Sequence, residues 1–346
     1  MAVSALQQTR VALRTGLATR IGTLVVAILI VALLGPKVVH FGGLFLVKIL
    51  ISGLAVGAVY ALIAIGYTMV YGIIELINFA HGDVFTMGAF ISTFFMGLFG
   101  VQEGVSSGIG LVAALIAIFL ITMLLTGGIN VAIERVAYRP LRNAPRLSPL
   151  ITAVGMSFVL EGILNLIVGP STHHYPDLLP DVSIPLGGGA TITSKQLIVM
   201  AIAAVLVAAL AMFINRSRLG KAMRATAQDR DAAQLMGIDI NRTISATFFI
   251  GAALAGAGGI VYGLYNNNIQ FQLGFETGLI AFTAAVLGGI GNIPGAALGG
   301  LLIGIVDQVS TGYIADTWKD VAIFSVLILI LTLRPTGLLG MRVPEK

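Results

Sequence analysis

The sequence of 346 residues contains no cysteine, and charged residues make up only 10% of it. Without cysteine there are no disulfides, no thiol nucleophiles and no cysteine-ligated metals. Apolar residues make up 57% of the chain, and the mean hydropathy is +0.99. The longest polar segments have about 25 residues, which is too few to bury a core of their own. These properties predict one integral membrane domain with loops.

Several functional motifs are also missing. Residues 219–222 are the nearest approach to a P-loop, but they lack the upstream glycine and the Ser/Thr that hold phosphate and magnesium. There is no H-E-x-x-H or G-x-S-x-G motif. His173 and His174 lack the spaced carboxylates or cysteines of a metal site. The sequence pI is ≈ 9.6, but no soluble surface carries a basic stripe for nucleic acid. We therefore expect no catalytic residue, no metal site, no bound cofactor and no nucleic-acid partner.

Long apolar windows predict an all-α integral membrane protein with about eight transmembrane helices. The windows lie at 21–35, 44–66, 84–100, 108–133, 148–168, 195–214, 243–265 and 320–333. We expect the first window to be a retained helix, because no convincing signal-peptide cleavage site follows it.

Two further segments predict broken or re-entrant helices. The runs 277–290 and 296–306 flank the turn GGIGNIPG, and each is too short to cross a hydrocarbon core of about 30 Å. Segment 67–83 is apolar but contains several polar residues, and it must return the chain to the side from which it came. Irregular backbone at membrane depth is tolerated only where protein covers it or it lines a cavity.

Basic residues predict the orientation. Placing 1–20, 134–147, 215–242 and 334–346 in the cytoplasm puts sixteen of the 20 Lys and Arg residues there. Both termini are then cytoplasmic. The loop 169–194 is then external, and its length and prolines suit a partner-binding surface.

The 43 glycines include many in small-xxx-small spacing, which lets helix backbones approach closely in lipid. The clearest examples are Gly53/Gly57, Gly259/Gly263, Gly295/Gly299 and Gly300/Gly304. Helix packing is the main interpretation of these pairs, and a substrate path lined by small residues is the alternative.

Polar residues in the two broken segments are candidates for a substrate pathway. Glu75, Asn78 and His81 have i, i+3, i+6 spacing, which predicts one helix face. Gly289, Gly291 and Asn292 lie in the second break, where the interrupted helix leaves backbone N–H and C=O groups exposed. The alternative for the first set is mutual hydrogen bonding between helices or exposure near the cytoplasmic end. Glu161 and Asn165 form another polar pair with the same alternative.

Residues 216–242 form a charged island between long apolar spans. The string Asp231-Ala232-Ala233-x-x-x-Gly237 resembles the EAA-x3-G signature with which importer permeases dock a separate ATPase. We expect a short helix over 229–236 that ends at Gly237. The predicted docking residues are Arg224, Asp229, Asp231, Ala232, Ala233 and Gly237. A basic tether near anionic lipid is the alternative. The signature is incomplete, since Asp231 replaces its Glu, Thr247 falls where Ile is usual, and no Pro follows nearby.

Four strings together resemble the branched-chain amino acid ABC-importer permease family, specifically its LivH-type subunit. They are GLAVGAVYALIAIGYTMVYGIIELINFAHGD (53–83), GKAMRATAQDRDAAQLMGI (220–238), LGGIGNIPGAALGGLLIG (287–304) and LRPTGLLG (333–340). The resemblance covers a permease domain at 44–340. It leaves a basic extension with the first helix at 1–43 and a cytoplasmic tail at 341–346.

This resemblance implies a non-enzymatic, multi-pass subunit of the bacterial plasma (inner) membrane, in contact with membrane lipid. The implied partners are a LivM-type permease, two cytoplasmic ATP-binding subunits that carry ATP and Mg, and an extracytoplasmic substrate-binding protein. The usual substrates are leucine, isoleucine and valine, and close relatives carry urea or short amides. Whether the partner permease is a homologue or a second copy stays open. An ion-coupled secondary carrier is the alternative from another class, because broken helices also build its sites. A scarcity of acidic residues deep in the spans argues against that alternative.

Overall fold

The protein is described here by a computed structural model, which covers residues 35–101, 108–142, 144–145 and 147–340. The principal helices are α2 (Gly43–Ile74), α3 (Ala80–Leu98), α4 (Ile109–Ile133), α5 (Leu147–Val168), α6 (Ser194–Arg216), α7 (Arg218–Gln228), α8 (Arg230–Leu235), α9 (Ile240–Asn266), α10 (Leu273–Gly288), α11 (Ile293–Tyr313) and α12 (Lys319–Leu333). Short helical turns lie at η1 (Glu134–Tyr138), η2 (Arg139–Leu141) and η3 (Asp316–Trp318). The prediction of an all-α membrane protein is confirmed.

Among the described residues, six helices are long and apolar enough to cross a membrane: α2, α4 with η1 and η2, α5, α6, α9 and α11. The predicted first span at 21–35 lies almost wholly outside the described residues. The expectation that 296–306 is too short to cross was wrong, because α11 continues for 21 residues to Tyr313. Its apolar run ends at Asp307, but a helix keeps its backbone hydrogen bonds through polar residues. The other run forms α10, which at 16 residues stays short.

The predicted break within 67–83 is present, but it is narrower than expected. Tyr67–Ile74 continue α2 without interruption, and the non-helical residues are Glu75–Phe79. Glu75 adopts a left-handed backbone conformation with φ 54°, which ends α2. The prediction that Glu75, Asn78 and His81 share one helix face was therefore wrong. His81 belongs to the first turn of α3, and Asn78 lies in the connection before it.

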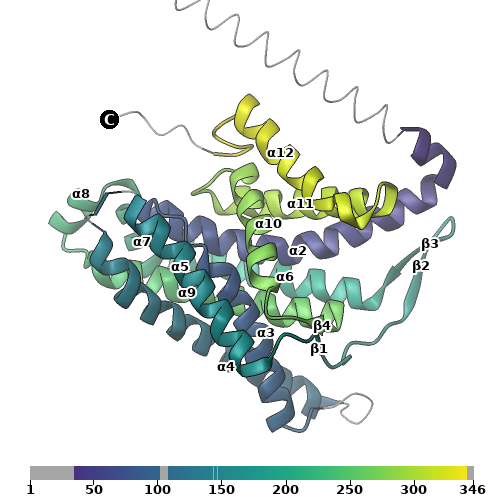
Figure 1. The fold of residues 1–346 in the computed structure, drawn as a ribbon, viewed down its shortest axis with the longest axis horizontal. Coiled ribbons are helices and arrows are strands. Elements are labelled where there is room, and N and C mark those ends of the chain that lie inside the picture. Colours follow the sequence, from purple (N-terminus) through teal and green to yellow (C-terminus); the bar gives the residue numbers. More distant parts are fainter. Residues whose placement is uncertain (1–34, 102–107, 143, 146, 341–346) are drawn as a thin grey trace, which may run out of the picture.

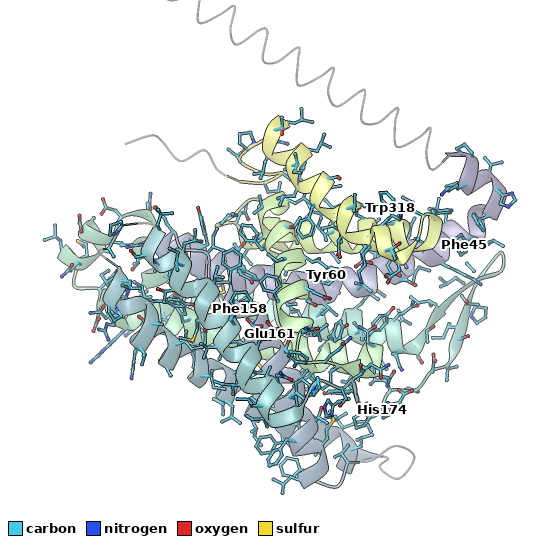
Figure 2. All side chains as sticks on the ribbon, in the orientation of Figure 1. Phe45, Tyr60, Phe158, Glu161, His174 and Trp318 are labelled. Carbon is cyan, nitrogen blue, oxygen red and sulfur yellow. The ribbon has the colours of Figure 1, made fainter. Side chains whose placement is uncertain are left out.

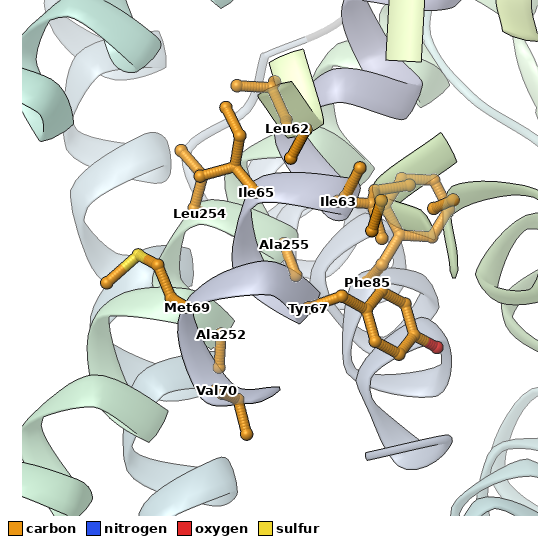
Figure 3. Close-up of a cluster of buried hydrophobic side chains, with 14 of the residues drawn as sticks. Leu62, Ile63, Ile65, Tyr67, Met69, Val70, Phe85, Ala252, Leu254 and Ala255 are labelled. Carbon is orange, nitrogen blue, oxygen red and sulfur yellow. The ribbon is translucent and has the colours of Figure 1, made fainter. Parts of the chain in front are cut away.

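Helices α2 and α9 form the centre of the bundle (Figure 1). In their most apolar windows, 72% of α2 and 78% of α9 is buried, against 22% or less for α4, α5 and α6. Figure 3 shows the contact between them, where Ile65 and Met69 of α2 lie close to Leu254 and Ala252 of α9. Exposed apolar side chains on α4, α5 and α6, among them Phe158 of α5 (Figure 2), are suited to lipid or to another membrane subunit.

Small residues form the seam between α2 and α11, as the small-xxx-small spacing predicts. A Cβ added at Gly57 would lie 2.7 Å from the Cα of Leu301, and one at Gly304 would lie 2.3 Å from the Cα of Gly57. The other predicted pairs also pack closely against neighbours. A Cβ added at Gly259 would overlap the backbone of α3, and one added at Gly299 would overlap the backbone of α10. The interpretation of these glycines as helix-packing residues is confirmed.

Four short strands lie in the loops. β2 (Ser183–Gly187) and β3 (Ala190–Thr193) form an antiparallel hairpin, with Ile184 opposite Ile192 and an irregularity between Pro185 and Gly187. β1 (His173–His174) pairs with β4 (Asn268–Ile269). Figure 1 places the hairpin and α8 at opposite ends of the bundle, which we call the hairpin end and the α8 end.

Candidate functional site: the α8 end and the two helix breaks

The charged island folds into α7 and α8, and side-chain caps set the boundary between them. The Ser217 hydroxyl accepts from the Gly220 N–H at 2.9 Å at the start of α7. The Asp229 carboxylate accepts from the Ala232 N–H at 3.0 Å at the start of α8. Such caps satisfy N–H groups that have no partner within their helix. Gly237, with φ +83°, follows the last turn, and the Ile238 N–H donates to the Ala233 carbonyl at 3.1 Å. The prediction of a short helix ending at Gly237 is confirmed.

α8 presents most of its surface outward. Asp231, Ala232 and the backbone of Gly237 are exposed, whereas Ala233 is buried against the bundle. Leu235 and Met236 have relative exposures of 88% and 83%, so the tip of α8 is apolar. Exposed apolar side chains at the end of a short helix are suited to a groove in another protein. The docking role of these residues stays a prediction.

Two arginines attach the island to the ends of transmembrane helices. Arg224 of α7 donates from Nη1 to the Ile214 carbonyl near the end of α6. Arg230 of α8 donates to the Ile73 carbonyl in the last turn of α2, from Nε at 3.2 Å and from Nη2 at 2.6 Å. Both contacts place a cation at the carbonyl end of a helix, where it is stabilised by the helix dipole.

The first break holds Glu75 and Asn78 in different surroundings. Glu75 is exposed, whereas Asn78 is only 1% exposed and accepts from the Tyr138 hydroxyl at 2.7 Å. The Asn78 Nδ2 has no hydrogen-bond partner within the described part of the chain. His81 is buried, and its ring lies 4.8 Å from that of Tyr67, centroid to centroid. Asn78 and His81 are therefore covered by protein in this conformation.

The second break is covered by the segment after α12. The Leu338 and Leu339 N–H groups donate to the carbonyls of Leu287 and Gly288 at 2.8 and 2.9 Å. Asn292 caps α11 by accepting from the Gly295 N–H, and its Nδ2 donates to the Leu339 carbonyl at 2.6 Å.

Gly289 and Gly291 differ in what surrounds them. A Cβ on Gly289 would lie 2.3 Å from the Gly340 nitrogen, so a side chain there would displace the C-terminal segment before it could narrow a path. Gly291 is exposed, with open space where a Cβ would be. Its φ of +88° would nonetheless strain any other residue.

The structure brings the two breaks together. A Cβ on Gly72, in the last turn of α2, would lie 3.3 Å from the Cα of Gly291. Ile77 of the first break and Ile290 of the second line the same small gap beside Tyr71. The residues predicted from two distant segments are thus near neighbours, although their side chains do not form one face.

A cavity of about 640 Å³ lies at the α8 end. Its walls combine the first break (Glu75, Leu76, Ile77), the island (Asp229, Arg230, Asp231) and the region around η1 (Glu134, Tyr138, Arg142). This volume is within the range of small-molecule sites, roughly 300–1,000 Å³. The cavity separates most of α8 from the first break.

The chain matches the sequence family described as branched-chain amino acid transport system / permease component over residues 49–331. It belongs to this family. The high-affinity branched-chain amino acid transport system permease protein BraD of Pseudomonas aeruginosa is 43% identical over 315 residues, covering 90% of this chain and 99% of the relative. LivH of Escherichia coli K12 is 42% identical over 306 residues, covering 88% of this chain and 98% of the relative. A probable LivH of Methanocaldococcus jannaschii is 27% identical over 296 residues, covering 81% and 88%. No solved structure matches the chain.

Family membership confirms the resemblance and the expectation of a membrane transport subunit rather than an enzyme. Together with the apolar helices it also confirms a multi-pass membrane location. In the described ranges of the permease, no group of three or more His, Asp or Glu side chains could hold a metal ion.

The sequence analysis did not identify several buried polar residues of the permease. Glu134 is 1% exposed, forms an ion pair with Arg142, and accepts from the Ser245 hydroxyl at 2.7 Å. Asp83 is buried and accepts from Ser157. Neither residue stood out as a buried acid in the sequence, because the Ser157 and Ser245 hydroxyls that they accept from are 74 and 111 residues away. Glu134 could have been noticed as an acid at the junction of an apolar span and a basic segment.

Proposed function

We propose that this permease is the translocation subunit of an ATP-driven importer for branched-chain aliphatic amino acids. Its ATP and Mg would be bound by separate partner subunits. The observation that carries this proposal is α8: a short, capped helix with an exposed apolar tip, attached to the bundle by Arg230. The substrate class is supported by relatives that carry this name and match nearly the whole chain.

The α8 end is proposed to face the cytoplasm. Among the described residues it holds the arginine-rich turns after α4, the α6–α9 connection and Arg334. The hairpin end holds lysines, including Lys37, Lys195 and Lys319. An excess of Lys and Arg on one side is the usual determinant of orientation. Both termini would then be cytoplasmic, and about eight helices would cross the membrane, as predicted from the sequence.

The partners follow from this orientation. α8 would dock one of two ATP-binding subunits on the cytoplasmic side through the predicted docking residues, which are Arg224, Asp229, Asp231, Ala232, Ala233 and Gly237. The hairpin would face an extracytoplasmic binding protein, and the outward apolar helices would face lipid and a LivM-type second permease.

The two breaks are proposed to line the substrate route. They meet beside Tyr71, and breaks offer backbone N–H and C=O groups to a zwitterion within an apolar surrounding. Asn78 has an unused amide donor for a substrate carboxylate once the connection moves. Glu75, His81, Gly291 and Asn292 are the other members of the proposed route. Gly289 supports the route only indirectly, because it holds the C-terminal segment.

The proposal is tested by reconstituting the permease with its partner subunits in vesicles. ATP inside should drive uptake of radiolabelled leucine delivered by the binding protein, and omission of ATP should abolish it. Replacing Asp231–Gly237 with a Gly/Ser linker should leave the protein inserted but release the ATP-binding subunits. Uptake that persists without ATP and follows an ion gradient would show that the chain is a secondary carrier instead.

A further inference from the structure

Arg230 connects α8 to the first break. The last carbonyls of a helix have no partner within the helix, so they must bind something else. Ile73 is the next-to-last residue of α2, and its carbonyl accepts from both Nε and Nη2 of Arg230. The break begins two residues later, at Glu75. A two-pronged guanidinium contact fixes direction as well as distance, which a single ammonium cannot do.

The rest of α8 is attached elsewhere. Its main contacts are with α7 and α9, and the cavity of about 640 Å³ lies between it and the break. Arg224 holds α7 to α6 and makes its contact away from α2. Arg230 is therefore the direct polar connection, within the described part of the chain, from α8 to the end of α2.

Movement at Ile73 would reach Asn78 through a short path. Between the two lie only the end of α2 and part of a non-helical connection. Asn78 is held on its other side by the Tyr138 hydroxyl, from η1. A displacement of α8 that draws Arg230 away from the bundle would pull the Ile73 carbonyl while Tyr138 stays in place. The connection would then change shape and expose Asn78.

We infer that Arg230 is a positioning residue that transmits the displacement of α8 to the first break. This inference rests on the proposed function and adds to it the residue that couples ATP use to the substrate route. Arg230 transmits movement and does not bind the ATP-binding subunits. A complex that lacks the Arg230 side chain therefore assembles and hydrolyses ATP but transports little substrate.

The test uses the full complex in vesicles with Arg230→Gln, Arg230→Lys and the control Arg242→Gln. Arg242 is 90% exposed at its side chain and pairs with Asp239, so the control removes the same charge away from α2. We expect Arg230→Gln to retain the ATP-binding subunits and their hydrolysis. Leucine imported per ATP should fall roughly tenfold or more, the size expected for loss of hydrogen bonds from a charged group. For Arg230→Lys, the leucine imported per ATP should lie between the values for Arg230→Gln and wild type. For the control Arg242→Gln, it should equal the wild-type value. An unchanged ratio for Arg230→Gln, or loss of the ATP-binding subunits, would overturn the inference.

A second measurement does not depend on the transported substrate. The chain has no native cysteine, so Leu76→Cys in the break can be labelled specifically with a maleimide. Adding a non-hydrolysable ATP analogue should change the labelling rate when Arg230 is present and leave it unchanged in Arg230→Gln. An equal change in both backgrounds would refute the coupling role. If wild type shows the change but imports no branched-chain amino acid, the proposed substrate fails while the role of Arg230 stands.

Discussion

The seam between α2 and α11 predicts a large effect for one added methyl group. In Gly304→Ala the new Cβ would lie 2.3 Å from both Cα and N of Gly57 and 2.4 Å from the carbonyl oxygen of Gly53. All three atoms are backbone, so no side-chain rotation can relieve the overlap, and the two helices must separate. Overpacking of this kind typically destabilises by about 1–3 kcal/mol. The helical preference for alanine over glycine offsets about 0.8–1 kcal/mol of that. We expect a net loss of up to about 2 kcal/mol.

The matched control for this prediction is Gly128→Ala in α4. No atom lies within 4 Å of the Cβ that this change adds, so alanine should keep its helical advantage there. Unfolding of both variants by denaturant in the same detergent measures the difference. Gly304→Ala should unfold earlier than wild type, and Gly128→Ala at the same point or later. Equal stability of the two variants would mean that α2 and α11 do not approach as described.

Three further predictions concern topology, the first break and the hairpin end. A cysteine replacing Ser183 should react with a membrane-impermeant maleimide from outside, and one replacing Ala227 should react only after permeabilisation; the reverse pattern would invert the proposed orientation. Asn78→Leu should reduce leucine uptake and lower stability by about 1–3 kcal/mol, because a buried tyrosine hydroxyl loses its acceptor; wild-type uptake would remove this residue from the route. The Lys195 ammonium, 2.9 Å from Asp177, holds the pKa of that carboxyl below its usual value. The contribution of the pair is therefore present at neutral pH and lost as pH falls below about 4. The difference in melting temperature between wild type and Asp177→Asn should shrink over that range, and a constant difference would show that the ion pair does not contribute.

Short-range signals predicted the α8 end well. An Asp at the start, small residues through the turn and Gly237 at the end are local determinants, and the structure has the helix they specify. The existence of both breaks was also predictable, because polar residues and a glycine-rich turn interrupt apolar runs.

The position of the first break was not predictable from local signals. The string from Glu75 to Phe79 contains no glycine or proline, and Glu75 takes the left-handed conformation that usually belongs to glycine. Burial of Asn78 against Tyr138 and the Arg230 contact with Ile73 hold the chain there. These partners are 60 and 157 residues away in the sequence, so no periodicity could reveal them.

Hydropathy averaged over a window also does not reveal single buried acids. These acids help to specify which helices pair. In lipid the hydrophobic effect does not favour one helix partner over another, so polar contacts and close packing must do so. Asp307 of α11 accepts from the Tyr60 hydroxyl of α2 at 2.6 Å, beside the glycine seam. Asp83 of α3 accepts from Ser157 of α5, and Glu134 of η1 accepts from α9. Each acid therefore joins two segments that are far apart in sequence. A carboxylate that bridges helices in this way is accounted for by assembly of the bundle. The buried acids consequently add no support to the ion-coupled alternative, although the sequence analysis had underestimated how many acids lie deep in the protein.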